Sequence, residues 1–495
     1  MDQPFFLALG AIFCLTTITY FALNKAQRDL LAKRFYWRGR RASTAATPPR
    51  SLSPEKKAPN NGPAPANYTE AFPPHRREAL AEIAPSLSPA QQQKLIGHEV
   101  SDELFKKSIL PFTANYAECD GNKFTPTRIS VDEIKALGDF PDYATLSGVP
   151  LPQPYKEFNI DTALPRPYRP FRWAYHQTMS LTKLEPDWWL ELESTYKARI
   201  AQRKGLYEKY GKLVLQYLPG SELACKELME MALQFLCARY PQYFELGSDK
   251  KTFKNRILET EQDVSAKHPL LVLLDNVPED FAITLRNPED GYYYFRAGVI
   301  CSALGWNVNT KIGMSLKDIH KPIPDYKQKM EFSMDRFFSK MPIDRPIQRG
   351  SWGLEVDKPL FMPPGDPHEK YREYQAQDLT LDRCHLRVDW QTLRRLPYSG
   401  GIVFNFKAVF SPVEEFRDEP YIPSIILKIL NEGKKNLMEY KNTWHVEHIC
   451  KPALEQYQRE QEEQGLIPKD WEVETLEQSP WFPGWADKWH RQQGF

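Results

Sequence analysis

The sequence lacks the short motifs that mark the common nucleotide-binding and hydrolase sites. Among its 495 residues there is no G-x-G-x-x-G, no G-x-x-x-x-G-K-S/T, no G-x-S-x-G and no H-E-x-x-H. The seven cysteines form no C-x-x-C pair, which removes the spacing of a ferredoxin-type iron–sulfur cluster. Their odd number and wide scatter indicate a reducing compartment rather than a disulfide framework.

A strong charge of one sign is also missing. The 65 basic and 64 acidic side chains leave a formal net charge of +1, so we expect no nucleic-acid partner. Apolar residues make up 41% of the chain, an ordinary globular value. The length fits one large domain or two to three smaller ones.

Charged residues are absent from the stretch between Pro4 and Leu23. About 20 helical residues span about 30 Å, the thickness of the hydrocarbon core of a bilayer. The stretch is followed by a cluster of basic residues: Lys25, Arg28, Lys33, Arg34, Arg38, Arg40 and Arg41. By the positive-inside rule we expect residues 1–41 to form a single-pass anchor, in the endoplasmic reticulum membrane, with the catalytic body in the cytosol.

Large aliphatic residues are few between residues 42 and 75, where eight prolines occur. Such a segment buries too little apolar surface to offset its ordering entropy, so it is expected to be a disordered linker. Residues 76–164 form a lead-in segment with a short helix expected over 76–83. The last residues, 442–495, predict a helix followed by an irregular tail.

Between these segments the periodicity changes from helical to extended. Helices are expected from Glu185 to about Tyr210 and over 221–240, where Ser221 is a candidate N-cap. The stretches 281–285 and 292–304 flank "RNPEDG" and predict a hairpin, as do 384–396 and 402–410 around "PYSGG". The alternation in each arm predicts one buried face, which in the second arm consists of Ile402, Phe404, Phe406, Ala408 and Phe410. A further strand is expected over 347–356.

Three groups of residues remain as candidates for chemistry. The first, His445, His448 and Cys450, offers zinc ligands but lacks the fourth ligand of a closed site. The second is a set of cationic and aromatic residues on the predicted strands, either a solvated face or a pocket for an anionic cofactor: Arg296, Arg349, Trp352, Arg387, Arg394 and Arg395.

The third candidate is His320, in "KIGMSLKDIHKPIPDY". The local sequence alone is typical of a surface histidine at the end of a helix. Apolar neighbours and the two prolines after it, which are expected to hold the chain extended, also fit an imidazole fixed over an apolar cavity, as an axial haem ligand requires. Cys301 is a rival ligand through its thiolate.

The run from Tyr292 to Phe338, then "RGSW" and then "LRVDWQTLRRLPYSGGIVFNFKAVFSPVEE", resembles the haem-dependent oxidative N-demethylase alpha-subunit family. The resemblance covers residues 165–441 and points to a fungal-type, membrane-anchored member. It implies an α+β fold in which a PAS-like antiparallel sheet, with helices packed around it, encloses haem b and its iron. It also implies oxygen-dependent oxidation of a secondary amine.

Carried onto this sequence, the resemblance implies that His320 of the I-H-x-P-x-P motif is the iron ligand. Arg387, Gln391, Arg395 and Arg349 are then pocket or propionate contacts. The family's Arg-x-Glu-Arg-Gln pattern is replaced here by Arg387-Val388-Asp389-Trp390-Gln391, so dimethylamine is not assumed as the substrate. Asp389 is the candidate catalytic acid or partner of a substrate ammonium.

The resulting hypothesis is a membrane-anchored haem monooxygenase acting on an amine or another small organic substrate. Because the chain carries no flavin or iron–sulfur motif, electrons are expected from a separate NADPH- or NADH-dependent reductase. Two alternatives stay open. One is a haem-binding sensor or carrier without turnover, and the other is an anchored scaffold without a cofactor.

Overall fold

The computed structural model describes residues 101–175 and 178–494. The predicted anchor, the linker and the helix over 76–83 lie outside these residues. Within them, none of the helices combines the length and apolar character needed to cross a bilayer.

The described residues form an antiparallel sheet of seven strands in the order β1-β8-β9-β10-β6-β7-β2. The strands are β1 (Thr182–Lys183), β2 (Leu215–Tyr217), β6 (Asp280–Arg286), β7 (Tyr293–Val299), β8 (Ile347–Val356), β9 (Cys384–Arg395) and β10 (Ile402–Pro412). The fold is therefore α+β with antiparallel strands, as expected, and its likeness to a PAS domain stays a prediction. Both predicted hairpins are present, and the strand predicted over 347–356 is β8.

The turn between β9 and β10 shows why the second hairpin forms where the sequence predicts it. Gly400 adopts a φ of +68°, a conformation that costs glycine little and other residues more. The Leu396 N–H donates to the Gly401 carbonyl at 2.8 Å, and Arg395 pairs with Ile402 directly behind the turn. This closure sets the register of the two longest strands.

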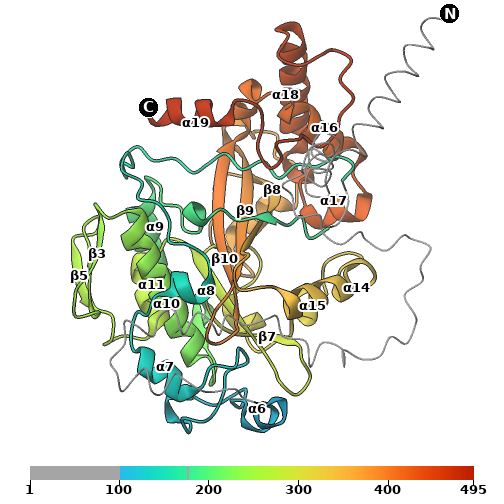
Figure 1. The fold of residues 1–495 in the computed structure, drawn as a ribbon. Coiled ribbons are helices and arrows are strands. Elements are labelled where there is room, and N and C mark those ends of the chain that lie inside the picture. The colour runs from blue at the N-terminus through green and yellow to red at the C-terminus, as the bar shows by residue number, and fades with distance from the viewer. Residues whose placement is uncertain (1–100, 176–177, 495) are drawn as a thin grey trace, which may run out of the picture. The chain divides into compact units, whose positions relative to one another are not determined.

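Helices cover both faces of the sheet (Figure 1). On one face lie α9 (Tyr196–Tyr210), α10 (Glu222–Arg239) and α11 (Pro269–Asn276), whose apolar residues join the largest core cluster. On the other face lies the predicted helical insertion between β7 and β8, which consists of α12 (Val308–Lys311), α13 (Leu316–His320), α14 (Tyr326–Lys329) and α15 (Glu331–Lys340).

The remaining elements lie before and after this body. The lead-in contains α6 (Asp102–Ser108), α7 (Val131–Leu137) and α8 (Tyr143–Ser147), and the C-terminal part contains α16 (Ile422–Glu432), α17 (Lys435–Lys441), α18 (Trp444–Glu463) and α19 (Trp485–Gln493). A small sheet of β3 (Phe244–Leu246), β4 (Thr252–Asn255) and β5 (Thr260–Asp263) was not expected from the sequence. The predicted C-terminal tail also contains one more helix, α19.

The helix predicted to begin at Glu185 is interrupted. A 3-10 turn over Pro186–Trp188 is followed by irregular chain, and α9 begins only at Tyr196. The reason is that Glu191 and Glu193 turn inward, where Glu191 accepts from the Arg166 side chain at 2.9 Å and Glu193 lies 3.6 Å from the Lys407 ammonium. These buried partners need a backbone that a continuous helix does not provide.

The prediction for the buried face of β10 is confirmed for Ile402, which is fully buried, and wrong for the phenylalanines. Asn405 and Lys407 are buried, while Phe404 and Phe406 are only half-buried. Asn405 donates to Glu279 at 2.5 Å, and Lys407 donates to the Glu191 carbonyl at 2.5 Å. Because these polar groups are paired inside, the phenylalanines of β10 are left on the same face as the polar residues of β9.

Candidate functional site

His320 ends α13, a single helical turn that is fastened to the sheet. The Phe295 N–H of β7 donates to the Met314 carbonyl at 3.0 Å, and the Gly313 N–H donates to the Phe295 carbonyl at 2.8 Å. Ser315 forms a bridge to Tyr294 and caps the helix by accepting from the Asp318 N–H at 3.3 Å. These contacts hold the turn, and with it His320, against β7.

The imidazole of His320 is oriented by its own helix. Its Nδ1 lies 2.7 Å from the Leu316 carbonyl, which only accepts, so Nδ1 carries the proton and donates. Nε2 is then the unprotonated nitrogen, and no hydrogen-bond partner for it lies among the described residues. Burial lowers the pKa of His320 to about 4, so the ring is neutral at physiological pH.

The chain after His320 turns rather than extends, contrary to the expectation from Pro322 and Pro324. Lys321 keeps a helical conformation, and the Ile323 N–H donates to the His320 carbonyl at 2.9 Å. The turn brings back Tyr326, whose ring stacks on the imidazole with centroids 5.6 Å apart. The imidazole is therefore supported by a ring as well as by the backbone bond.

The sheet face near His320 changes from apolar to cationic across three strands. Phe406 of β10 is paired with Gln391 of β9, and Gln391 is paired with Arg349 of β8. Ile319, beside His320, packs in one apolar cluster with Phe404 and Phe406. Directly opposed residues on antiparallel strands lie about 5 Å apart, so this row is a continuous surface.

Arg349 is the cation of this row, and nothing in the described residues pairs with it. Its Nε is buried without a hydrogen-bond partner, and its guanidinium forms no ion pair with a carboxylate of residues 101–175 or 178–494. Burial lowers its pKa, and its positive charge in turn lowers the pKa of His320. Arg349 and His320 therefore lie within electrostatic range of each other.

Arg387, by contrast, is fully engaged. It donates to the carbonyls of Ser302 and Pro359 at 2.5 Å each, and to the Asp389 carboxylate at 2.8 Å. Asp389 remains 38% exposed and lies on the same face of the sheet as Arg387 and Gln391. Arg387 thus fixes a loop and orients Asp389.

Arg395 is likewise used in structural contacts. Its guanidinium donates to the carbonyls of Met341 and Gly400 at 2.7 Å each, to the Tyr293 hydroxyl at 2.8 Å, and to the Phe338 carbonyl. It fastens the end of α15 to the sheet. Gln391 and Arg349 are the two proposed pocket contacts whose side chains carry no such bonds to the described residues.

Trp390 lies on the opposite face of β9 from Asp389. It is buried in the largest core cluster, and its indole N–H donates to the Gln348 amide at 3.1 Å. The side chain at this position therefore affects the packing of the core and does not face His320.

Lys441, at the end of α17, is a residue that the sequence analysis did not single out. Its ammonium donates to the Trp352 carbonyl at 2.7 Å and lies 4.2 Å from the centre of the Trp352 ring. Burial and then the charge of Arg349 lower its pKa to about 7, while Asp389 opposes the shift. No local signal marks this lysine, because its neighbours come from distant strands.

The other candidate ligands are placed elsewhere. Cys301 is fully buried, and burial raises its pKa to about 12, which keeps the thiol protonated. His445 donates to the Asn442 carbonyl and His448 to the Ala376 carbonyl, at 2.9 Å each. The described residues contain no group of three or more ligands that suits a metal ion.

Residues 180–451 match the family model described as haem-dependent oxidative N-demethylase, alpha subunit-like. The matched region includes every element of the sheet that carries the residues named above, together with α13 and Lys441.

Proposed function

The chain belongs to the haem-dependent oxidative N-demethylase, alpha subunit-like family, and on this premise we propose that it binds haem b through His320 and oxidises an amine. The family is one of haem-dependent oxidoreductases. The observation that carries the proposal for this chain is the neutral His320 ring, with one nitrogen held by the Leu316 carbonyl and the other without a partner.

The residues around His320 are suited to binding haem. An axial imidazole needs an unprotonated nitrogen and a hydrogen bond on the other one, and His320 supplies both. Haem combines an apolar ring with two carboxylates, and the row from Phe406 to Arg349 runs from an aromatic side chain to an unpaired cation. We assign the ring to Phe404, Phe406 and Ile319, and a propionate to Arg349.

When bound, haem would supply the iron at which dioxygen is activated and the carbon next to the amine nitrogen is oxidised. The carbinolamine product falls apart to an amine and an aldehyde as a proton moves from its hydroxyl group to its nitrogen. Asp389, which is partly exposed on the same face of the sheet as Gln391, would accept a hydrogen bond from a substrate ammonium. Lys441, with its pKa lowered to about 7, can give or take that proton near neutral pH.

The proposal includes a separate reductase and a membrane anchor. Two electrons and two protons are needed for each dioxygen that inserts one oxygen atom and forms one water. An NADPH- or NADH-dependent partner would deliver the electrons. Residues 1–41 would hold the body at the cytosolic face of the endoplasmic reticulum, near such a partner. A glycan at Asn67, detected by glycosidase treatment, would contradict this orientation.

Absorption spectroscopy of the haem-supplied full chain tests the proposal. We expect a Soret band that His320→Ala shifts or removes and that His368→Ala, a control histidine bonded to the Val356 carbonyl, leaves unchanged. A band that is the same in His320→Ala would show that the ligand is wrong, and no band at all would support the scaffold alternative.

Turnover separates the enzyme from the sensor. With haem bound, NADPH, a reductase and a set of secondary amines, release of an aldehyde is expected to depend on His320 and on Asp389. Haem binding with no aldehyde from any amine would favour the sensor or carrier. Asp389→Asn is the matched variant, because it keeps the side-chain shape and removes the charge.

A further inference from the structure

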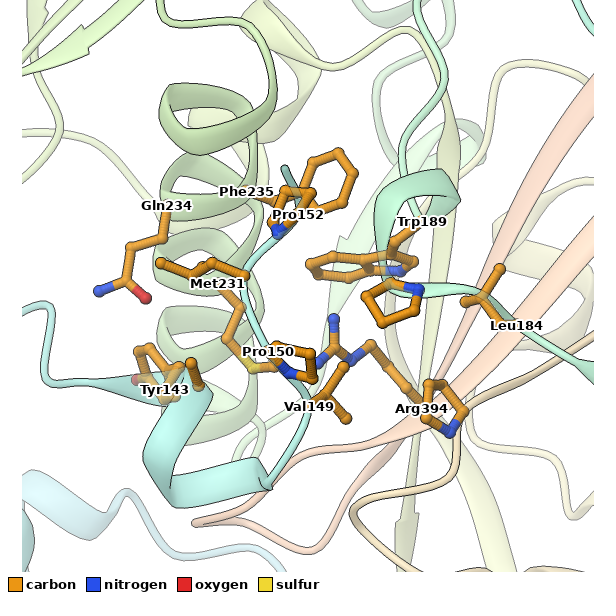
Figure 2. Close-up of a pocket in the computed structure, with 14 residues that line it drawn as sticks. Tyr143, Val149, Pro150, Pro152, Leu184, Trp189, Met231, Gln234, Phe235 and Arg394 are labelled. Carbon is orange, nitrogen blue, oxygen red and sulfur yellow. The ribbon is translucent and has the colours of Figure 1, made fainter. Parts of the chain in front are cut away.

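A second candidate site lies on the face of the sheet opposite His320. It is a narrow cleft whose walls are mostly apolar and include four prolines and two aromatic rings: Pro150, Pro152, Pro186, Pro346, Trp189 and Phe235 (Figure 2). Arg394 of β9 reaches into the cleft between Pro150 and the Trp189 ring. Since successive side chains of a strand alternate, Arg394 points away from the face that carries Gln391 and Arg395.

Arg394 is a buried cation without an acceptor. It is only 6% exposed, its Nε has no hydrogen-bond partner, and none of its nitrogens donates to any described residue. Its guanidinium carbon lies 4.2 Å from the centre of the Trp189 ring. The ring therefore covers one face of the guanidinium and leaves the edge, where the N–H groups point, available. The Trp189 indole nitrogen is a second buried donor without a partner.

The nearby carboxylates are occupied by other groups. Glu227 accepts from the Ser399 N–H at 3.0 Å and from the Ser399 hydroxyl at 2.7 Å, and also from the Tyr398 N–H. Glu230 accepts from the Tyr143 hydroxyl at 2.6 Å and from Lys226. Neither lies within ion-pair distance of Arg394 among the described residues. Burial lowers the pKa of Arg394 to about 10, which still leaves it charged at neutral pH.

Leaving a charged donor buried and unpaired costs free energy, and an anion that enters the cleft would offset this cost. We propose that the cleft, whose volume is about 20 Å³, binds a short aliphatic monocarboxylate of the size of formate or acetate, with the carboxylate on the edge of Arg394 and any methyl group against the prolines. One guanidinium matches one negative charge and both oxygens of a carboxylate. A phosphate dianion would keep an uncompensated charge beside apolar walls. The site is separate from the proposed function and does not depend on it.

Isothermal titration calorimetry of the haem-supplied full chain tests the site, with sodium formate, sodium acetate and sodium phosphate as ligands. We expect the two carboxylates to bind with one site per chain and phosphate to bind more weakly. Arg394→Met is expected to weaken carboxylate binding about tenfold or more, because charge-assisted hydrogen bonds are lost. Arg256→Met, which removes a half-exposed surface arginine, is the control and leaves the affinity unchanged.

Other variants decide the outcome where Arg394→Met does not fold. Arg394→Lys keeps the charge but loses the bidentate edge, and Trp189→Phe keeps the ring but loses the N–H. Each is expected to weaken binding by a factor of about three to ten. The proposal would be overturned if Arg394→Lys and Trp189→Phe both bound the carboxylates as tightly as the unmodified chain. It would also be overturned if phosphate bound as tightly as the carboxylates. Loss of binding in His320→Ala would also overturn it, because the carboxylate would then lie on the opposite face.

Discussion

Arg349 and Arg387 lie on neighbouring strands and on the same face of the sheet, yet they are bonded in opposite ways. Arg387 donates to three backbone carbonyls and to Asp389, whereas Arg349 has no acceptor among the described residues. The two arginines should therefore respond differently to the same substitution by methionine. Replacing each one separates the contribution to stability from the contribution to the site.

The magnitudes follow from these contacts. Arg387→Met loses three charge-assisted hydrogen bonds to backbone carbonyls and a partly exposed ion pair with Asp389, which we expect to lower the free energy of unfolding by about 3–5 kcal/mol, mostly through the hydrogen bonds. Arg349→Met removes a desolvated charge that nothing compensates, so the stability of the haem-free chain should change by less than about 1 kcal/mol. If Arg349 holds a propionate, its loss should weaken haem binding by about 10-fold to 100-fold, at about 1.4 kcal/mol per factor of ten.

Urea unfolding followed by tryptophan fluorescence measures the first quantity, and haem titration followed at the Soret band measures the second. Arg349→Lys is the matched control, which keeps a positive charge and should recover part of the affinity. If Arg349→Met were destabilised by more than about 2 kcal/mol without haem, a structural partner would have to exist. If it bound haem as tightly as the unmodified chain, the assignment of Arg349 to a propionate would be wrong.

Three further predictions rest on other contacts. Arg169 and Glu419 are fully buried and bonded at 2.7 Å, so Arg169→Met should lower the free energy of unfolding by about 3–5 kcal/mol in urea, whereas the exposed Arg256→Met should cost less than about 1 kcal/mol. The pKa of His320 falls from 6.5 to about 4 on folding, so the unfolded chain takes up its proton first and stability falls as pH drops from 6.5 to 4. His320→Gln should reduce the slope of the unfolding free energy against pH in this range by an amount equivalent to up to one bound proton. An unchanged slope would refute the pKa shift of His320. Iodoacetamide at pH 8 should modify Cys119 first among the described cysteines, since Cys225, Cys301, Cys384 and Cys450 are buried and burial raises the pKa of the partly exposed Cys237 to about 12. Mass spectrometry that found Cys384 or Cys450 labelled in the folded protein would contradict the packing.

The sheet was largely predictable because its strands carry local signals. Period-two alternation and the Gly-containing turns located both hairpins, and β8 was found over the residues expected. The helix α10 was found from its apolar face, and α13 to α15 were expected as an insertion. These features depend on residues that are close together in the sequence.

What could not be predicted depends on partners far away in the sequence. The burial of Phe404 and Phe406 on β10 was predicted wrongly because Asn405 is paired inside with Glu279, more than 100 residues earlier. The same holds for Lys441, whose ammonium is bonded to Trp352. The sequence also could not separate the roles of the arginines, because the residue type is the same. Arg387 and Arg395 donate to backbone carbonyls, whereas the Nε atoms of Arg349 and Arg394 have no partner among the described residues.

The alternation along β9 places the residues of two proposed sites on one strand, Asp389 and Gln391 on one face and Arg394 on the other. A point substitution can alter either site alone. The loss or gain of one residue between Gln391 and Arg394 would instead exchange the faces of everything beyond it, placing Arg394 on the His320 side and Arg395 in the proline-lined cleft. The length of this strand is therefore under tighter constraint than the identity of its residues, and relatives that keep both sites should differ here by substitution and not by insertion or deletion.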